Sequence, residues 1–181
     1  WFQEINEKLE PAEPGLYRLK KQYCLPESFD SLFPRFLLGG EVSCVYKKGG
    51  RVRRVHHLIY APSLEAMKKI NARLAAIGNI HSDGRPILGL ASKELLKILL
   101  DVSAECVLIP AHVWTPWFGL FGSMSGYDSL QDCFEELTPR VFAIETGLSS
   151  DPPMNWRVPF LDEKAIISGS DSHSLTRLGR E

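Results

Sequence analysis

The pattern of hydrophobic and polar positions predicts three clear helices. After Ser63, apolar residues recur every three or four positions until Gly78, as on one face of a capped helix: Leu64, Met67, Ile70, Leu74 and Ile77. A second helix is predicted with Ser92 as its N-cap and leucines on its inner face: Leu95, Leu96, Leu99 and Leu100. A third is predicted over residues 128–137, and shorter helical segments over residues 1–9 and 155–161.

Segments rich in β-branched and aromatic residues predict strands. Residues 42–47 and 52–62 have this composition, and Lys48-Gly49-Gly50 between them suits a turn, so we expect a β-hairpin. Short apolar runs predict further strands at residues 36–38, 106–109, 141–144 and 165–167. Because strands and helices alternate at short spacing, we expect an α/β layered or barrel architecture with a largely parallel sheet. In such folds the site lies where the strands end.

Composition places the chain among globular proteins. Its 181 residues are 44% hydrophobic and 24% charged, and the formal net charge is −1. This excludes binding of nucleic acid through bulk positive charge, although Arg51, Arg53 and Arg54 cluster closely enough to line a local positive groove. No repeat, low-complexity tract or linker divides the sequence, so we expect a single domain over residues 1–181.

The cysteines and the longest uncharged stretch bear on the compartment. Cys24, Cys44, Cys106 and Cys133 form no CxxC pair and no dense disulfide framework, which favours a reducing, cytoplasmic location. Residues 106–127 contain no Asp, Glu, Lys or Arg, but their prolines, glycines and polar side chains are not those of a membrane span. We therefore expect no membrane association.

Side chains that can bind metals or transfer protons follow the predicted strands: Glu41, His112, Glu145, Asp171 and His173. Carboxylates and imidazoles from separate strands suit Zn, Mn or Fe, and two such metals can clamp a phosphoryl group. Asp171 and His173 stand two residues apart, so in an extended chain both point to the same side. Taken alone, that tripeptide favours a plain turn, with Asp171 capping the next helix and His173 at the surface.

Three further histidines are harder to interpret. His56 and His57 lie in one predicted strand, so their side chains point to opposite faces and at most one can enter a given site. We expect His57, next to an apolar run, to be the ligand, and His56 to lie at the surface or behind the ligands. His81 lies in a polar loop with Asp83 and Arg85, where a substrate contact and a solvated loop residue fit equally well.

Large aromatic residues gather in the segment after His112: Trp114, Trp117, Phe118, Phe121 and Tyr127. Rings of this size are costly to expose, so they either pack as a cover over the mouth of the fold or serve as platforms on which bases stack. Packing is the simpler interpretation. The rigid turn at residues 151–153 suits either a substrate-binding loop or a stiff connection.

Several of these segments together resemble the polymerase and histidinol phosphatase (PHP) superfamily of metal-dependent phosphoesterases. The matching segments are Gly40-Glu41-Val42, His57-Leu58, Pro110-Ala111-His112 and the run at residues 169–173. Within that superfamily, residues 79–86, 110–122 and 145–152 look like the DNA-repair family endonuclease Q. The resemblance extends from about residue 41 to residue 181.

The resemblance implies a distorted (β/α)7 barrel with two or three divalent metals, which cleaves DNA on the 5′ side of a deaminated base or abasic site. It implies five metal ligands, of which the last three are also catalytic: Glu41, His57, His112, Asp171 and His173. Four residues become candidate substrate contacts: Arg85, Trp117, Phe118 and, without a ligand role, Glu145. DNA is the implied partner, and a sliding clamp is a candidate partner of the longer protein.

The sequence departs from that family at its start. The family opens with an HxH pair on the first barrel strand, and no HxH occurs in these 181 residues. We therefore expect a partial PHP domain that lacks the first strand or strands of a longer polypeptide, with an incomplete and inactive metal centre on its own. Two alternatives stay open: a small-molecule phosphatase of the histidinol-phosphate type, and a catalytically silent nucleic-acid-binding or scaffold module.

Overall fold

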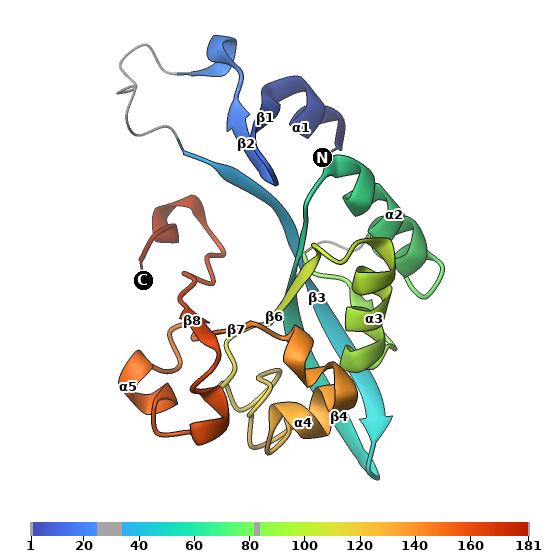
Figure 1. Cartoon of the computed structure of the whole chain (residues 1–181), viewed down its shortest axis with the longest axis vertical. Coiled ribbons are helices and arrows are strands. Elements are labelled where there is room, and N and C mark those ends of the chain that lie inside the picture. The colour runs from blue at the N-terminus through green and yellow to red at the C-terminus, as the bar shows by residue number, and fades with distance from the viewer. Residues whose placement is uncertain (1, 25–33, 82–83, 181) are drawn as a thin grey trace.

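A long antiparallel hairpin organises the computed structural model, which describes residues 2–24, 34–81 and 84–180 (Figure 1). Its strands are β3 (Phe36–Lys48) and β4 (Arg51–Ala61), paired continuously from Leu38 opposite Ala61 to Lys48 opposite Arg51. Gly49 and Gly50 form the turn with φ of 60° and 73°, a conformation that favours glycine. The predicted hairpin is confirmed, and the apolar run at residues 36–38 belongs to its first strand.

The remaining strands extend this hairpin mostly in antiparallel fashion. β1 (Leu9–Glu13), β2 (Leu16–Leu19) and β6 (Val107–Pro110) give the order β1-β2-β3-β4-β6, in which every neighbouring pair is antiparallel. Parallel pairing occurs where the short β5 (Ile87–Leu88) meets β3, and between β7 (Ala143–Glu145) and β8 (Ala165–Ile167).

The expectation of a largely parallel sheet is therefore wrong. Strands joined by a turn as short as Gly49-Gly50 have to run antiparallel, because a parallel pair needs a long crossover connection. Among the described residues the strands form two open sheets, and the expected (β/α)7 barrel is not seen.

The helices are α1 (Phe2–Lys8), α2 (Leu64–Ala75), α3 (Ser92–Val102), α4 (Leu130–Phe134) and α5 (Pro152–Asn155). The Ser63 hydroxyl accepts from the backbone N–H of Ala66, which confirms the predicted cap of α2. Ser92, by contrast, is the first residue of α3 and not its cap, because its hydroxyl bonds to side chains of β3 and β4. No helix in the described part of the chain is long and apolar enough to span a membrane.

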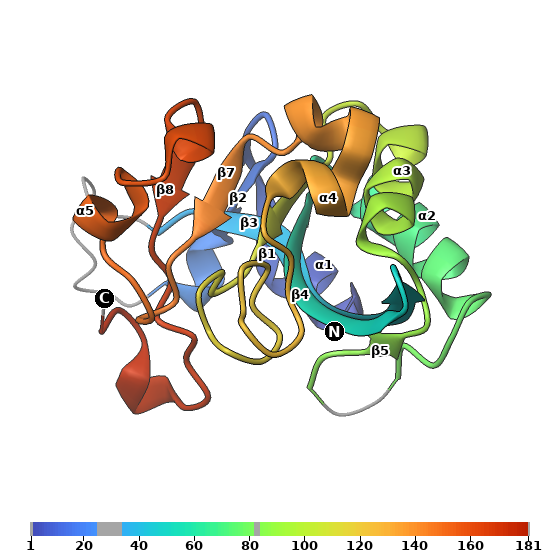
Figure 2. The same ribbon diagram turned by 90° about the horizontal axis from the view of Figure 1, so that it is seen from below.

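The two faces of the hairpin are covered differently. Helices α2 and α3 lie on one side of it, and β7, β8 and α5 lie on the other (Figures 1 and 2). The side toward the helices is apolar, with Val42, Val55, Ile70, Leu95 and Leu99 in one buried cluster. The polar candidate residues have to be sought on the opposite face.

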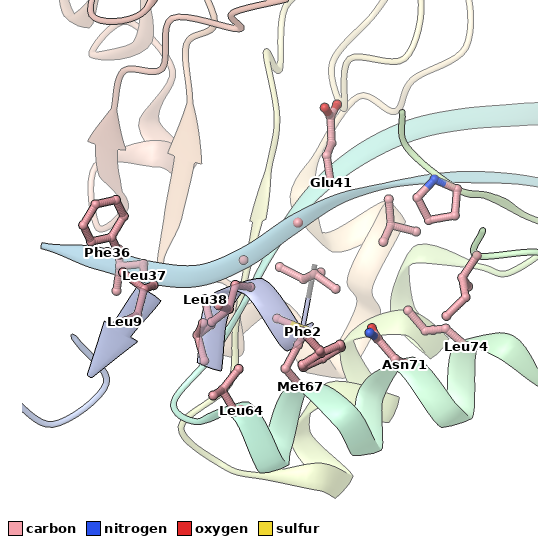
Figure 3. A pocket seen from close by; sticks show the side chains of 17 residues that line it. Phe2, Leu9, Phe36, Leu37, Leu38, Glu41, Leu64, Met67, Asn71 and Leu74 are labelled. Carbon is pink, nitrogen blue, oxygen red and sulfur yellow. The ribbon is translucent and has the colours of Figure 1, made fainter. Parts of the chain in front are cut away.

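An apolar pocket of about 420 Å³ opens on the helix side, between α1, β3 and α2 (Figure 3). Phe2, Leu38, Leu64 and Met67 are among its lining residues. Figure 3 shows the side chain of Glu41 pointing away from α2, to the other side of β3. Glu41 is itself among the lining residues, so the pocket and the polar site described next lie on opposite sides of β3 at this residue.

Candidate metal centre

Glu41, His56 and His112 converge on one point, with their ligand atoms all within 4.8 Å of one another. Glu41 lies on β3 and His56 on β4, and they share a face of the hairpin because Glu41 pairs with Leu58 and His56 with Ser43. His112 follows β6, the other neighbour of β4. His56 Nδ1 is 3.0 Å from His112 Nε2 and 3.1 Å from Glu41 Oε1, and Glu41 Oε1 is 3.7 Å from His112 Nε2.

The Arg85 guanidinium lies against this cluster. Its Nη1 is 2.7 Å from Glu41 Oε1 and 2.7 Å from His56 Nδ1. Because a guanidinium can only donate, the contact with Arg85 uses the lone pair of His56 Nδ1, whereas a hydrogen bond from His56 to Glu41 needs Nδ1–H, so the two contacts belong to different protonation states of the ring. The Glu41 oxygen and the His56 nitrogen that accept hydrogen bonds from Arg85 are also atoms that can bind Zn, Mn or Fe. One carboxylate and two imidazoles therefore fit a divalent metal.

Thr115 fixes the orientation of the His112 ring. Its Oγ1 lies 2.8 Å from His112 Nδ1 and 2.9 Å from the backbone carbonyls of both His112 and Trp117. Carbonyls can only accept, so they take the single hydroxyl proton and the Thr115 oxygen accepts from His112 Nδ1–H. His112 Nε2 then faces Glu41 and His56: it donates to Glu41 when protonated, and it carries a lone pair once that proton is lost. Thr115 was not among the site residues predicted from the sequence.

The residues of the cluster shift one another's pKa values. Burial alone would raise the pKa of Glu41, but hydrogen bonds to His112 and His56 and the charge of Arg85 hold it far below its usual range. For His112, burial would lower the pKa, and the hydrogen bond and charge of Glu41 raise it instead. Burial lowers the pKa of His56, which Glu41 offsets only in part. Glu41 therefore stays ionised and His56 neutral, as ligation of a cation requires, whereas His112 has to release its Nε2 proton when a metal binds.

His57 lies outside the cluster, on the helix side of β4. Its ring is fully buried, its Nε2 is 2.8 Å from Ser92 Oγ, and it contacts Phe134 edge-on at a centroid distance of 5.8 Å. Burial lowers its pKa to about 3. The two histidines do point to opposite faces, but their expected positions are reversed: His56 enters the cluster and His57 is a core residue.

Asp171 and His173 lie beside the cluster and not within it. His173 Nε2 is 3.5 Å from Arg85 Nη2, and the charge of Asp171 contributes to the raised pKa of His112. Asp171 has a φ of 41°, so the segment turns here and is not the extended chain that was expected. Nor does Asp171 cap a helix, since Ser174 precedes the next helical turn.

The remaining candidate residues fall into two environments. Trp117 is 46% exposed, and the Arg54 guanidinium lies 5.2 Å from its ring centroid. Phe118 is partly buried and stacks on His56 at a centroid distance of 4.4 Å. Glu145, at 4% exposure, is buried behind His112 and accepts its backbone N–H. The aromatic segment thus combines packed and exposed rings.

The expected loop residues add little to the cluster. The side chain of His81 is exposed, and its backbone N–H bonds to Asn79 Oδ1. Asp83 lies outside the described residues. Among the residues of this loop that the structure describes, only Arg85 contacts the candidate ligands.

The chain is similar in fold to endonuclease Q. The lesion-specific endonuclease PfuEndoQ of Pyrococcus furiosus matches 99% of this chain with a TM-score of 0.73 and 26% sequence identity, over 39% of its own length. Endonuclease Q in complex with a 27-mer duplex substrate carrying an abasic lesion at the active site matches with a TM-score of 0.74 and 26% identity. In that structure the match covers 99% of this chain and 40% of the other.

One curated protein is also similar in sequence. The uncharacterized protein YqxK of Bacillus subtilis (strain 168) is 34% identical over 128 residues, which make up 70% of this chain and 32% of YqxK. No family model matches the chain. The chain thus spans between about a third and two fifths of the length of the proteins that it resembles.

Proposed function

We propose that this chain contributes a metal-binding part of a phosphodiesterase that cuts DNA at damaged sites, 5′ of a deaminated base or an abasic site. The observation that carries the proposal is the convergence of Glu41, His56 and His112 from neighbouring strands. Similarity of the fold to endonuclease Q supports DNA as the substrate class.

Glu41, His56 and His112 would hold a divalent metal, and Asp171 and His173 beside them would extend the ligand set within the longer protein. A metal bound there would lower the pKa of a coordinated water and offset negative charge on the phosphoryl oxygens. Glu41 remains ionised and neutralises part of the cation's charge. Arg85 has the planar fork of donors that binds carboxylates and phosphates, and would help to orient a phosphate.

Trp117 and Arg54 are the proposed nucleic-acid contacts outside the cluster. The Trp117 ring is partly exposed, and the Arg54 guanidinium lies against it. An exposed aromatic ring can stack on an unpaired base, which is worth about 1–3 kcal/mol per base, and a neighbouring guanidinium can bind the adjacent phosphate. Phe118, by contrast, packs on His56 and would support that ring.

The test is a nicking assay of the full-length polypeptide on duplexes that carry an abasic site, uracil or hypoxanthine, with Mn, Zn or Fe supplied in turn. We expect cleavage 5′ of the lesion that EDTA abolishes and that an undamaged duplex does not show. His112→Ala should remove cleavage while leaving the circular dichroism spectrum unchanged.

Three outcomes would overturn the proposal. Native nicking by His112→Ala would exclude this residue as an essential ligand. Phosphate release from small phosphomonoesters, with every duplex left intact, would identify a small-molecule phosphatase. DNA binding with neither metal uptake nor cleavage would identify a silent binding module.

A further inference from the structure

His112 marks an abrupt change in the path of the chain. The residue before it, Ala111, donates its N–H to the carbonyl of His56 on β4, and the residue after it, Val113, donates to the carbonyl of Glu145 on β7. His112 itself has a φ of 30°, in the left-handed region that non-glycine residues seldom adopt. The backbone therefore crosses from one sheet to the other at the residue whose imidazole completes the cluster.

The Glu145 carboxylate binds the backbone at the point where the chain passes from one sheet to the other. Its Oε2 accepts the backbone N–H of His112, and the residue is only 4% exposed at the end of β7. A buried N–H and a buried carboxylate each carry a large cost without a partner, so the contact satisfies the His112 N–H and gives the carboxylate one of its partners. It also fixes an unfavourable backbone conformation, which persists only when its surroundings determine it.

Two glycines from different segments leave the space that this contact needs. A Cβ on Gly169, after β8, would overlap Glu145 Oε1, and a Cβ on Gly147 would overlap the Cβ of His112. Gly147 also has a φ of 53°. Segments that follow both β7 and β8 are therefore shaped around the pair formed by Glu145 and His112.

We propose that Glu145 is a positioning residue, which holds the His112 backbone so that Nε2 points at Glu41 and His56, and that it binds neither metal nor substrate. The inference rests on the proposed function only in that the cluster holds a metal. Glu145 acts through the oxygen that accepts the His112 N–H, so an acceptor at that place is needed and a negative charge is not.

Three variants of the full-length protein separate this role from ligation. Glu145→Gln keeps the shape and a carbonyl oxygen that accepts the His112 N–H, so we expect its affinity for Mn²⁺ to stay within about threefold of native. Glu145→Ala removes the acceptor, and Glu145→Asp has a side chain too short to reach the His112 N–H. For both we expect at least a tenfold loss of Mn²⁺ affinity. Isothermal titration with Mn²⁺ gives the affinity, and circular dichroism the fold. Glu163→Gln, at an exposed position outside the cluster, is the control.

The outcomes are distinct. Loss of Mn²⁺ binding in Glu145→Gln equal to that in Glu145→Ala would show that the charge matters and would overturn the positioning role. A folded Glu145→Ala with native Mn²⁺ affinity would also overturn it. If Glu145→Ala and Glu145→Asp fail to fold, a loss of Mn²⁺ affinity of about tenfold or more in the isosteric Glu145→Gln would still overturn the positioning role. A native protein that binds no Mn²⁺, Zn²⁺ or Fe²⁺ would instead contradict the proposed function.

Discussion

His56 and His57 are adjacent in β4, yet they lie in opposite environments. His56 faces Glu41, His112 and the Arg85 guanidinium, whereas His57 is enclosed between Ser92 and Phe134. One ring belongs to a polar cluster with charged neighbours, and the other is a core side chain whose charged form is strongly disfavoured. The difference shows that the parity of a strand, and not the kind of residue, decides which histidine can do chemistry.

Removal of His56 is expected to have the largest effect. We expect His56→Ala to lose metal binding by at least about a hundredfold and nicking by about a thousandfold or more, because one of three convergent donors is gone. The measurement is metal content by elemental analysis and nicking of an abasic duplex by the full-length protein. His57→Gln, on the other face of the same strand, should keep both once folded. Equal losses in the two variants would contradict the assignment.

Acid is expected to destabilise the fold through His57. Its pKa falls from an ordinary 6.5 to about 3 in the folded protein, so below pH 6.5 only the unfolded chain takes up the proton. Above pH 6.5, protonation of His57 does not affect the free energy of unfolding. As the pH falls from 6.5 toward 3, that free energy decreases progressively. The equilibrium constant for unfolding then rises roughly tenfold for each pH unit of acidification.

Hydrogen exchange of the β4 peptide in the metal-free full-length protein measures this effect. Between about pH 6 and pH 4 we expect native β4 to lose protection faster than β4 of His57→Gln, which has no group to titrate there. Carboxylates elsewhere are common to both proteins and cancel in the ratio. Parallel curves for the two proteins would show that His57 is not the buried neutral base described above.

Local patterns predicted much of the fold, and the directions of the strands were predicted less well. The hairpin and the cap at Ser63 follow from turn chemistry and periodicity within a few residues, and both are present. The order of the sheet depends on contacts between distant segments. Alternation of helices and strands suggested parallel pairing, but the central strands are joined by a tight turn and are antiparallel.

The candidate site was predicted in part for a similar reason. Glu41 and His112 follow apolar runs, and they do come together. The choice between His56 and His57 was wrong, although the sequence held a signal. That signal was slight: the face of His57 carries Val55, Ile59 and Ala61 but also Arg53, and the face of His56 carries Arg54 but also Leu58 and Tyr60. The contact of Arg85 with Glu41, 44 residues apart, has no local pattern to reveal it.

The smallest expected effect comes from loss of the hydrogen bond between Thr115 and the His112 ring. Thr115→Val keeps the shape of the side chain but removes the oxygen that accepts from His112 Nδ1–H. The ring is then free to take the other tautomer or to rotate, so we expect about a tenfold loss of metal affinity, the low end for the loss of such a partner. Thr115→Ser restores the hydroxyl and should recover the affinity. Titration of both variants with Mn²⁺ checks this, and native affinity in Thr115→Val would show that the His112 ring is held in place without the Thr115 oxygen.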